Sequence, residues 1–300
     1  MHKLILSLVF FAFASFLNAQ IIDNSKAILI DGESFFSSEF LKKNKIKTIV
    51  GELAVKEVMQ PIRTKGLINL YSFDKEGRLV EKLKTFKLRG GRVDTSSQTF
   101  AYNDLDQLIQ QSSFESSGYS SQKFEYDDSG RVKLQRYYRG ENLSPFGYQL
   151  EKGKTMNLKE ESFSYEQIDS LTLKKIYYNS NGAAYKEGII RLMPNGMKQS
   201  EKLRFYAIER NSEVNFLYDE YGRLEEVNKR SRIYKSESST IRFTYDEYDN
   251  VISELRIKNG ATVFTREFLY DVSTFLLKAE LTKNEENNTI NIIKYRYTYY

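Results

Sequence analysis

The chain has 300 residues, a formal net charge of +5 and an aromatic content of 14%, with no Cys, no Trp and one His, at position 2. This composition excludes disulfides, and from residue 3 onward it excludes Ser-His-Asp and Cys-His catalysis and His/Cys zinc sites. Charges of both signs are interspersed, so we expect no nucleic-acid partner, and any bound metal must be a hard cation such as calcium.

Residues 1–19 have the pattern of a secretory signal peptide. A basic start with Lys3 precedes an apolar run from Leu4 to Leu17, and the small Ala19 follows. This run is short for a transmembrane helix, and no stop-transfer segment follows it. We expect an exported protein that starts near Gln20 and keeps no integral membrane span. Its location is the periplasm, the cell surface or the extracellular space.

Residues 20–66 differ in pattern from the rest of the chain. The stretch SSEFLKK at 37–43 predicts a short helix capped by Ser37 or Ser38. The following segment, as far as Pro61, predicts two strands or a strand and a helix. We interpret residues 20–66 as an N-terminal cap that covers the first exposed edge of a β-sheet.

A short motif recurs within residues 67–300, and its best copy is FLYDEYGRL at 216–224. Phe216 and Tyr218 are two positions apart, so they share one face of a strand. Asp219 at the first turn position and Gly222 at the fourth predict a type I turn followed by a left-handed residue. Each copy is therefore predicted to be a β-hairpin with a three-residue loop and a glycine bulge.

The copies recur every 24 to 29 residues, apart from one gap of 92 between Tyr126 and Tyr218. Within that gap the stretches at 163–178, 177–188 and 191–206 carry degenerate hairpin signals, including two Asn-Gly turns. The chain is thus predicted to be all-β. We expect an array of antiparallel hairpin repeats that forms an extended, twisted or spiralling sheet.

The residues expected to build the turns have a structural role. They are Asp74, Gly77, Arg78, Tyr126, Asp127, Gly130, Arg131, Tyr218, Asp219, Gly222, Arg223, Tyr245, Asp246, Tyr270 and Asp271. Asp249 stands where the motif has glycine, and Asp tolerates the left-handed region, so that hairpin is expected to persist. Thr274 stands at the same position in the next copy, and a β-branched residue predicts a different or longer loop at 271–275.

This pattern resembles the YD repeat of the RHS and teneurin superfamily, which runs roughly aromatic-x-Tyr-Asp-x-x-Gly-Arg-Leu. The copies at 216–224, 124–132 and 71–79 carry the resemblance, the second with Val132 for leucine and the third with Phe73 for tyrosine. The resemblance implies a spiralling β-sheet, which in that family is sometimes closed into a shell around a toxic C-terminal domain. This chain is too short for such a shell, and we expect no toxin cargo. Carbohydrate binding is associated with some members.

Several patterns invite a catalytic interpretation without supporting one. The adjacent acidic pairs at 127–128, 160–161, 225–226 and 285–286 cannot be glycosidase dyads by themselves, because neighbouring strand residues point to opposite faces. The Ser-x-x-Lys stretch at 120–123 runs into a strand and not into a helix start. The acidic turns at 104–106 and 127–130 lack a complete calcium loop. We expect no enzyme activity, no catalytic residues, no cofactor and no metal site.

The remaining signals favour binding. Tyrosines on the solvent-exposed face of a sheet can stack on sugar rings or contact a protein. The turn arginines are expected to pair with Asp or to stack on Tyr. We interpret the chain as a cell-envelope or surface binding module for a glycan or a protein partner. A purely structural envelope protein is one alternative. An outer-membrane β-barrel is another alternative. The charges on both strand faces at 223–238 argue against it.

Overall fold

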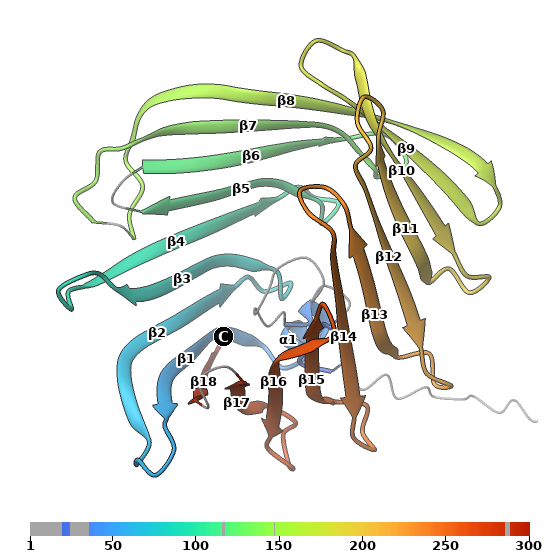
Figure 1. The fold of residues 1–300 in the computed structure, drawn as a ribbon. Helices are drawn as coiled ribbons and strands as arrows, with labels where there is room; N and C mark the ends of the chain where they lie inside the picture. The colour runs from blue at the N-terminus through green and yellow to red at the C-terminus, as the bar shows by residue number, and fades with distance from the viewer. Residues whose placement is uncertain (1–19, 25–35, 116–117, 147, 286–288) are drawn as a thin grey trace, which may run out of the picture.

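The structure, a computed structural model, describes residues 20–24, 36–115, 118–146, 148–285 and 289–300. The predicted signal peptide, residues 1–19, lies outside the described residues. Within them, one helix and eighteen strands form the regular structure (Figure 1). The helix is α1 (Ser38–Lys43), and the strands are β1 (Ile46–Lys56), β2 (Arg63–Phe73), β3 (Leu79–Lys87), β4 (Val93–Tyr102), β5 (Leu108–Glu115), β6 (Gly118–Tyr126), β7 (Val132–Asn142), β8 (Lys152–Asp169), β9 (Thr172–Tyr178), β10 (Ala184–Leu192), β11 (Lys198–Phe205), β12 (Asn211–Tyr218), β13 (Leu224–Ser231), β14 (Glu237–Tyr245), β15 (Val251–Lys258), β16 (Ala261–Tyr270), β17 (Leu277–Asn284) and β18 (Thr289–Tyr299).

The sheet closes on itself into a barrel. Each strand pairs antiparallel with the next along the chain, and β1 pairs with both β2 and β18. In that closure Gly51 of β1 lies opposite Asn69 on one side and Tyr295 on the other. The all-β class and the hairpin array are as predicted, whereas the extended or spiralling sheet is wrong. Closure pairs the edges that an open array leaves exposed, which accounts for the difference.

The N-terminal segment is divided between the wall and the interior. β1 is a strand of the barrel, and β2 begins at Arg63, so the boundary drawn after residue 66 falls inside β2. The predicted helix is present as α1, and the hydroxyl of Ser37 caps it by accepting from the backbone N–H of Phe40. Figure 1 shows α1 inside the ring of strands, where it fills part of the barrel.

The hairpin turns follow the residues that specify them. In the turn after β2, the amide of Gly77 donates to the carbonyl of Asp74, and Gly77 has a φ of 76°. Asp249 occupies the equivalent position with a φ of 66°, so this copy keeps the short turn without glycine. After β16 the loop is one residue longer, and its left-handed residue is Phe275 and not Thr274. Both departures match the expectations from sequence.

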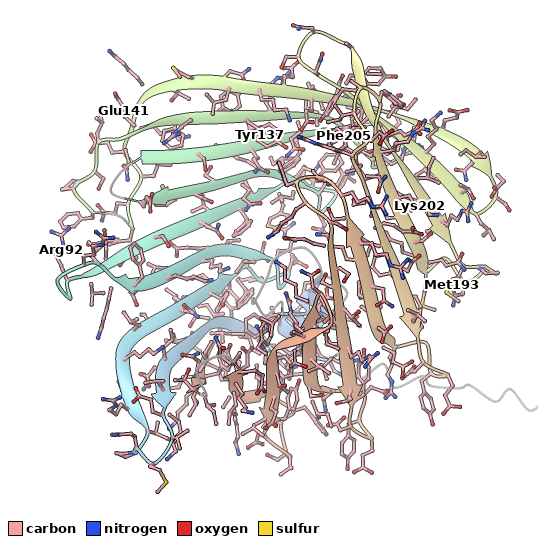
Figure 2. The ribbon with its side chains drawn as sticks, viewed as in Figure 1. Arg92, Tyr137, Glu141, Met193, Lys202 and Phe205 are labelled. Atoms are coloured by element: carbon pink, nitrogen blue, oxygen red, sulfur yellow. The ribbon has the colours of Figure 1, made fainter. Side chains whose placement is uncertain are left out.

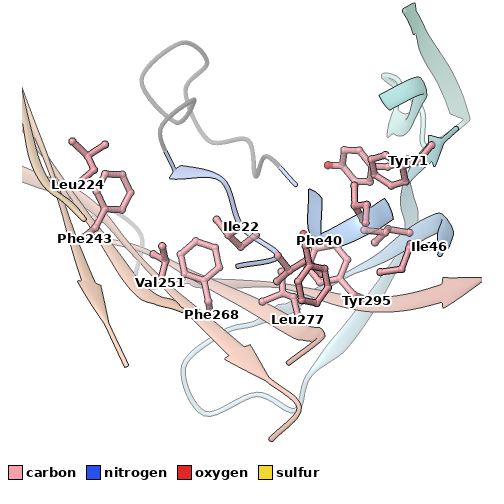
Figure 3. Packing of buried hydrophobic residues seen from close by; sticks show 14 of the residues in the cluster. Ile22, Phe40, Ile46, Tyr71, Leu224, Phe243, Val251, Phe268, Leu277 and Tyr295 are labelled. Carbon is pink, nitrogen blue, oxygen red and sulfur yellow. The ribbon is translucent and has the colours of Figure 1, made fainter. Parts of the chain in front are cut away.

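The apolar core lies inside the barrel on the side formed by β1, β2 and β13–β18. There Phe40 and Leu41 of α1 belong to one buried cluster with Tyr71, Phe268 and Tyr295 from the surrounding strands (Figure 3). Ile21 and Ile22 join the same cluster from the segment that precedes α1. The face of the sheet that contacts α1 is thus the inner face, and cross-strand partners share a face all round the barrel.

Candidate functional site: the barrel lumen

The motif tyrosines join successive hairpins from the inside. In each case the phenol O–H donates to the backbone carbonyl of the residue that follows an earlier turn, at 2.5 to 3.0 Å. The pairs are Tyr102 with Leu79, Tyr126 with Leu108, Tyr165 with Val132, Tyr218 with Lys198, Tyr245 with Leu224, Tyr270 with Val251 and Tyr297 with Leu277. We name this contact the tyrosine stitch. It gives the motif tyrosine a role in holding the barrel together.

The aspartate and arginine of the motif complete the stitch. Arg223 donates from Nε to Asp219 at 2.7 Å and reaches Asp249 of the next turn at 2.6 Å. Its guanidinium also lies over the ring of Tyr245, 4.4 Å from the ring centroid. Two backbone N–H groups, those of Tyr221 and Arg223, donate to the same Asp219 carboxylate. These contacts lower the pKa of Asp219 although burial acts to raise it.

The same arrangement recurs in the other well-preserved copies. Arg78 pairs with Asp74 at 2.7 Å and stacks on the ring of Tyr102, and Arg131 pairs with Asp127 at 2.9 Å. The amide N–H of Arg131 is the largest cause of the lowered pKa of Asp127. The turn residues of these copies therefore contact one another and neighbouring strands within the barrel wall.

The degenerate copies replace arginine with other partners. Asn250 is 4% exposed, and its amide donates to Asp246 at 3.0 Å. Asp271 accepts from Ser273, which is the largest cause of its lowered pKa, and it pairs with Lys278 at 2.9 Å. Each turn carboxylate thus retains a local donor.

Of the acidic pairs, Glu160 and Glu161 are split between the two faces of β8. Glu160 pairs on the outer face with Arg136 of β7 at 2.7 Å, whereas Glu161 points inward. Ser120 and Lys123 of the Ser-x-x-Lys stretch also lie on opposite faces of β6, and Lys123 lies over the ring of Tyr138. Within the described part of the chain, no group of three or more His, Cys, Asp or Glu side chains is arranged to hold a metal ion.

The inner faces of β7–β11 carry a cluster that the sequence reasoning missed. Its members are Tyr137, Lys159, Glu161, Phe163, Tyr165, Lys175, Tyr177, Tyr185, Lys186 and Phe205. We name it the lysine–tyrosine cluster, and Figure 2 labels Tyr137 of β7 and Phe205 of β11 at its two sides. It lies in the segment where the repeat is degenerate. The Asn-Gly turn at 179–182 sets the β9–β10 register, so it was the one sequence signal that could have placed Lys175 and Lys186 on one face.

Glu161 is the anionic centre of this cluster. It is 5% exposed and accepts hydrogen bonds from the hydroxyls of Tyr185 and Tyr137, while Lys159 lies 3.1 Å away. Burial acts to raise the pKa of Glu161, but the hydrogen bonds from Tyr185 and Lys159 together hold it below its ordinary value. Burial and the same carboxylate raise the pKa of Tyr137 to about 12. Glu161 is therefore ionised and fully engaged.

A cavity of about 570 Å³ lies over β3–β7, and its lining combines polar side chains with Phe114, Tyr119 and Leu158. Its inward-facing lining residues are Lys82, Lys84, Ser96, Gln98, Ser113, Glu115, Ser120 and Arg139. Gln98 donates to Ser113 at 3.0 Å, which orients the amide across two strands. Hydroxyls, an amide and cations therefore face one space inside the barrel.

A second set of buried charges lies on β15 and β16, on the side of the barrel that contains the apolar core. Glu254 accepts from Arg256 and lies 3.3 Å from Arg266, and all three are less than 10% exposed on the inner faces of β15 and β16. Phe264 lies beside both guanidinium groups. Glu254 thus offsets part of the positive charge of the two arginines within the plugged side of the barrel.

The outer face of the barrel carries cross-strand ion pairs. Arg242 of β14 pairs with Glu226 of β13 at 2.5 Å, and Arg204 of β11 pairs with Glu187 of β10 at 2.8 Å. Both acidic partners are glutamates of the neighbouring strand, whereas the sequence led us to expect Asp or Tyr. As for helices, none in the described ranges combines the length and apolar character needed to cross a membrane.

No protein-family model and no curated protein matches the chain. Among solved structures, a porin-like protein from Bacteroides uniformis is 13% identical, with a TM-score of 0.38 over 84% of this chain and 98% of that one. A porin-like protein from Bacteroides vulgatus is 9% identical, with a TM-score of 0.33 over the same shares. The TcdB2-TccC3-TEV structure is 11% identical, with a TM-score of 0.25 over 76% of this chain and 15% of that one.

Proposed function

We propose that this chain is an exported, non-enzymatic β-barrel of YD-type hairpins that binds a glycan inside its lumen. The observation that carries the proposal is the cavity of about 570 Å³ over β3–β7, whose lining combines hydroxyl, amide and charged groups with aromatic rings, together with the aromatic wall on β7–β11. Hydroxyl and amide groups suit the hydrogen-bonding of sugar hydroxyls, and tyrosine rings supply stacking area with a polar tip. A cavity of this size holds a small oligosaccharide.

The tyrosine stitch supports the YD assignment. In the copies that match the motif best, tyrosine, aspartate and arginine all act within one connection between neighbouring hairpins. This gives a physical reason for the residue types at those spacings. The long gap in the repeat coincides with the strands that carry the lysine–tyrosine cluster, β7–β11.

A membrane-embedded barrel is the second candidate, and the closed ring of eighteen described strands favours it. The outer face opposes it. Paired charges such as Arg136 with Glu160 and Arg242 with Glu226 occupy outward positions within the strands. Each charge on a lipid-facing strand costs about 2–4 kcal/mol at the bilayer midplane. We therefore favour a barrel surrounded by water in the periplasm or at the cell surface.

The first experiment separates these two candidates. Cells of the native host are fractionated and the membranes are washed with carbonate. Release of the protein by carbonate supports the proposal, and retention with a heat-modifiable gel band supports the membrane barrel. Protease treatment of intact cells then distinguishes the surface from the periplasm.

The second experiment tests the lumen directly. The purified protein is titrated with neutral and acidic oligosaccharides by calorimetry, with Gln98→Leu as the lumen variant. Gln110→Leu is the matched control, because Gln110 lies on the outer face of β5. Saccharide binding that weakens in the lumen variant alone supports the proposal. The absence of binding to every saccharide leaves the purely structural role and overturns it.

A further inference from the structure

We propose that Lys175 of β9 and Lys186 of β10 form an anion-binding subsite in the lumen, which receives the oxyanion of an acidic saccharide. This inference rests on the proposed lumen-binding function and specifies its ligand class. The chemistry is that of a carboxylate or sulfate group held by two ammonium groups beside tyrosine rings.

The register brings the two lysines together. Lys186 lies opposite Tyr177, and Lys175 lies opposite Gly188, so the lysines are diagonal neighbours on one face of the β9–β10 pair. That face is the inner one. Lys186 also lies opposite Phe205 of β11, and Phe205 shares its face of the sheet with Val214 of β12, which packs against the apolar core. Both ammonium groups therefore point into the lumen.

Neither lysine has an anionic partner within the residues that the structure describes. The two nearby carboxylates are already engaged. Glu161 accepts from Tyr185 and Lys159, and Glu201 pairs with Lys198 at 3.0 Å. Two cations are thus close together, and neither forms an ion pair with a carboxylate of the described residues. Glu161 and Glu201 act on them only from a longer distance, so a bound anion would relieve the remaining repulsion.

Aromatic rings shield both groups from water. The ammonium of Lys175 lies 4.0 Å from the ring centroid of Phe163 and 4.8 Å from that of Tyr177. The ammonium of Lys186 lies 4.2 Å from the ring centroid of the same Tyr177. Burial, as the largest cause, lowers the pKa of each lysine. An oxyanion bound here is held in a less polar environment than water, where charge-assisted hydrogen bonds are stronger.

Gly188 of β10 lies opposite Lys175 and carries no side chain. Gly188 is buried in the middle of β10, and a Cβ at this position would meet only ordinary contacts, at 3.6 Å to Tyr177 and 3.9 Å to Leu203. Its backbone lies outside the left-handed region, so the strand itself does not require glycine. What glycine provides at this position is a missing side chain next to an unpaired cation.

The test measures binding by calorimetry on the exported full chain. The ligands are a uronic-acid oligosaccharide, a sulfated oligosaccharide, a neutral oligosaccharide of the same length and inorganic sulfate. The variants are Lys175→Gln/Lys186→Gln and Gly188→Val. The control is Lys174→Gln/Lys202→Gln, which removes two lysines from the outer faces of β9 and β11.

We expect the double lumen variant to bind the acidic ligand at least about tenfold more weakly, with neutral binding and the control unchanged. Gly188→Val keeps both charges and should also weaken acidic binding, because it places a branched side chain opposite Lys175. The ratio of carboxylate to sulfate affinity identifies the oxyanion. Thermal denaturation verifies folding, and the double variant should be at least as stable as the parent because it removes repulsion between like charges.

The outcomes separate the two proposals. Neutral binding with no preference for the acidic ligand overturns the subsite and leaves the lumen function standing. Acidic binding that is unchanged in the double variant also overturns it, because the anion is then held elsewhere. Binding of sulfate alone, without any saccharide, shows an adventitious ion only. No binding of any ligand defeats the proposed function itself.

Discussion

The side of the barrel built from β12–β18, β1 and β2 contrasts with the segment β7–β11 in what its inward side chains contact. On the first side, Val227, Phe243 and Phe268 pack in one cluster with α1, and the turns β12–β13, β14–β15 and β16–β17 each have a tyrosine stitch. In the second segment, Lys175 and Lys186 face the lumen without a carboxylate partner among the described residues.

This contrast shows how a repeat divides structural and functional roles. Where the motif is preserved, its tyrosine, aspartate and arginine are used in joining hairpins, so they are not available for a ligand. Where the motif is degenerate, the strands still pair, because backbone hydrogen bonds and an Asn-Gly turn suffice for a hairpin. The inward-facing side chains of that segment are not required for its strands to pair.

The largest expected effect lies in the plugged core. Phe268→Ala should lower the free energy of unfolding by about 3–5 kcal/mol, because this ring is 5% exposed and leaves a cavity in the apolar cluster. Phe205→Ala in the lumen wall should cost about 1–2 kcal/mol, since Phe205 is only half-buried. Urea denaturation followed by tyrosine fluorescence measures both. Equal losses would remove the distinction between the two regions.

The hairpins could be predicted from sequence because their turns are specified locally. Asp219 and Gly222 alone determine a turn, and the same applies to the longer loop at 271–275. Closure could not be predicted in this way. It depends on β1, which lacks the motif and meets β18 across more than 200 residues of chain. The accumulated twist and stagger of all the strands decide it, and no local pattern records them.

The lysine–tyrosine cluster escaped prediction for a related reason. Lys175 and Lys186 belong to no motif, and they meet only because the turn at 179–182 sets the register of β9 against β10. Whether that face points inward follows from closure. The site therefore depends on the one architectural feature that the repeat pattern does not specify.

The next largest effect concerns the turns. Asp219→Ala should lower the free energy of unfolding by about 1.5–3 kcal/mol, because Arg223 and two backbone N–H groups lose a charged acceptor. Asn179→Ala, in the turn between β9 and β10, removes an acceptor of two backbone N–H groups without any arginine. It should cost about 0.5–1.5 kcal/mol. Chemical denaturation of the two variants compares them, and a larger loss for Asn179→Ala would contradict the role given to the stitch.

A smaller effect isolates the tyrosine hydroxyl. Tyr245→Phe removes the hydroxyl that donates to the carbonyl of Leu224 and accepts from the side-chain amide of Asn24. It should lower the free energy of unfolding by about 1 kcal/mol. Tyr177→Phe should change stability little, because its hydroxyl makes no hydrogen bond within the described residues. Hydrogen exchange at the rim of β13 and β14 provides the readout. Faster exchange in both variants, or in neither, would show that the stitch is not what separates the two regions.

The smallest effects appear in the pH dependence of stability, and the two regions respond in different pH ranges. The pKa of Asp219 lies below its ordinary value of 3.8, so its stabilising contribution is present above that value and is lost as pH falls through the folded-state pKa. The pKa of Lys175 and that of Lys186 lie below 10.5, so the unfolded chain binds more protons than the folded chain in the interval between. Stability should therefore rise as pH increases through the folded-state pKa values toward 10.5.

Two variants separate the acid and the alkaline contributions by thermal denaturation across pH. Asp219→Asn should flatten the acid limb and leave the alkaline limb unchanged. Lys175→Met/Lys186→Met should do the reverse and also raise stability near neutral pH, because the lysines repel each other beside the positive Lys159. Glu161 and Glu201 offset part of that repulsion, so the gain should be modest. A double variant that loses stability at neutral pH would mean that the lysines hold the barrel together, and the contrast between a structural region and a binding region would then fail.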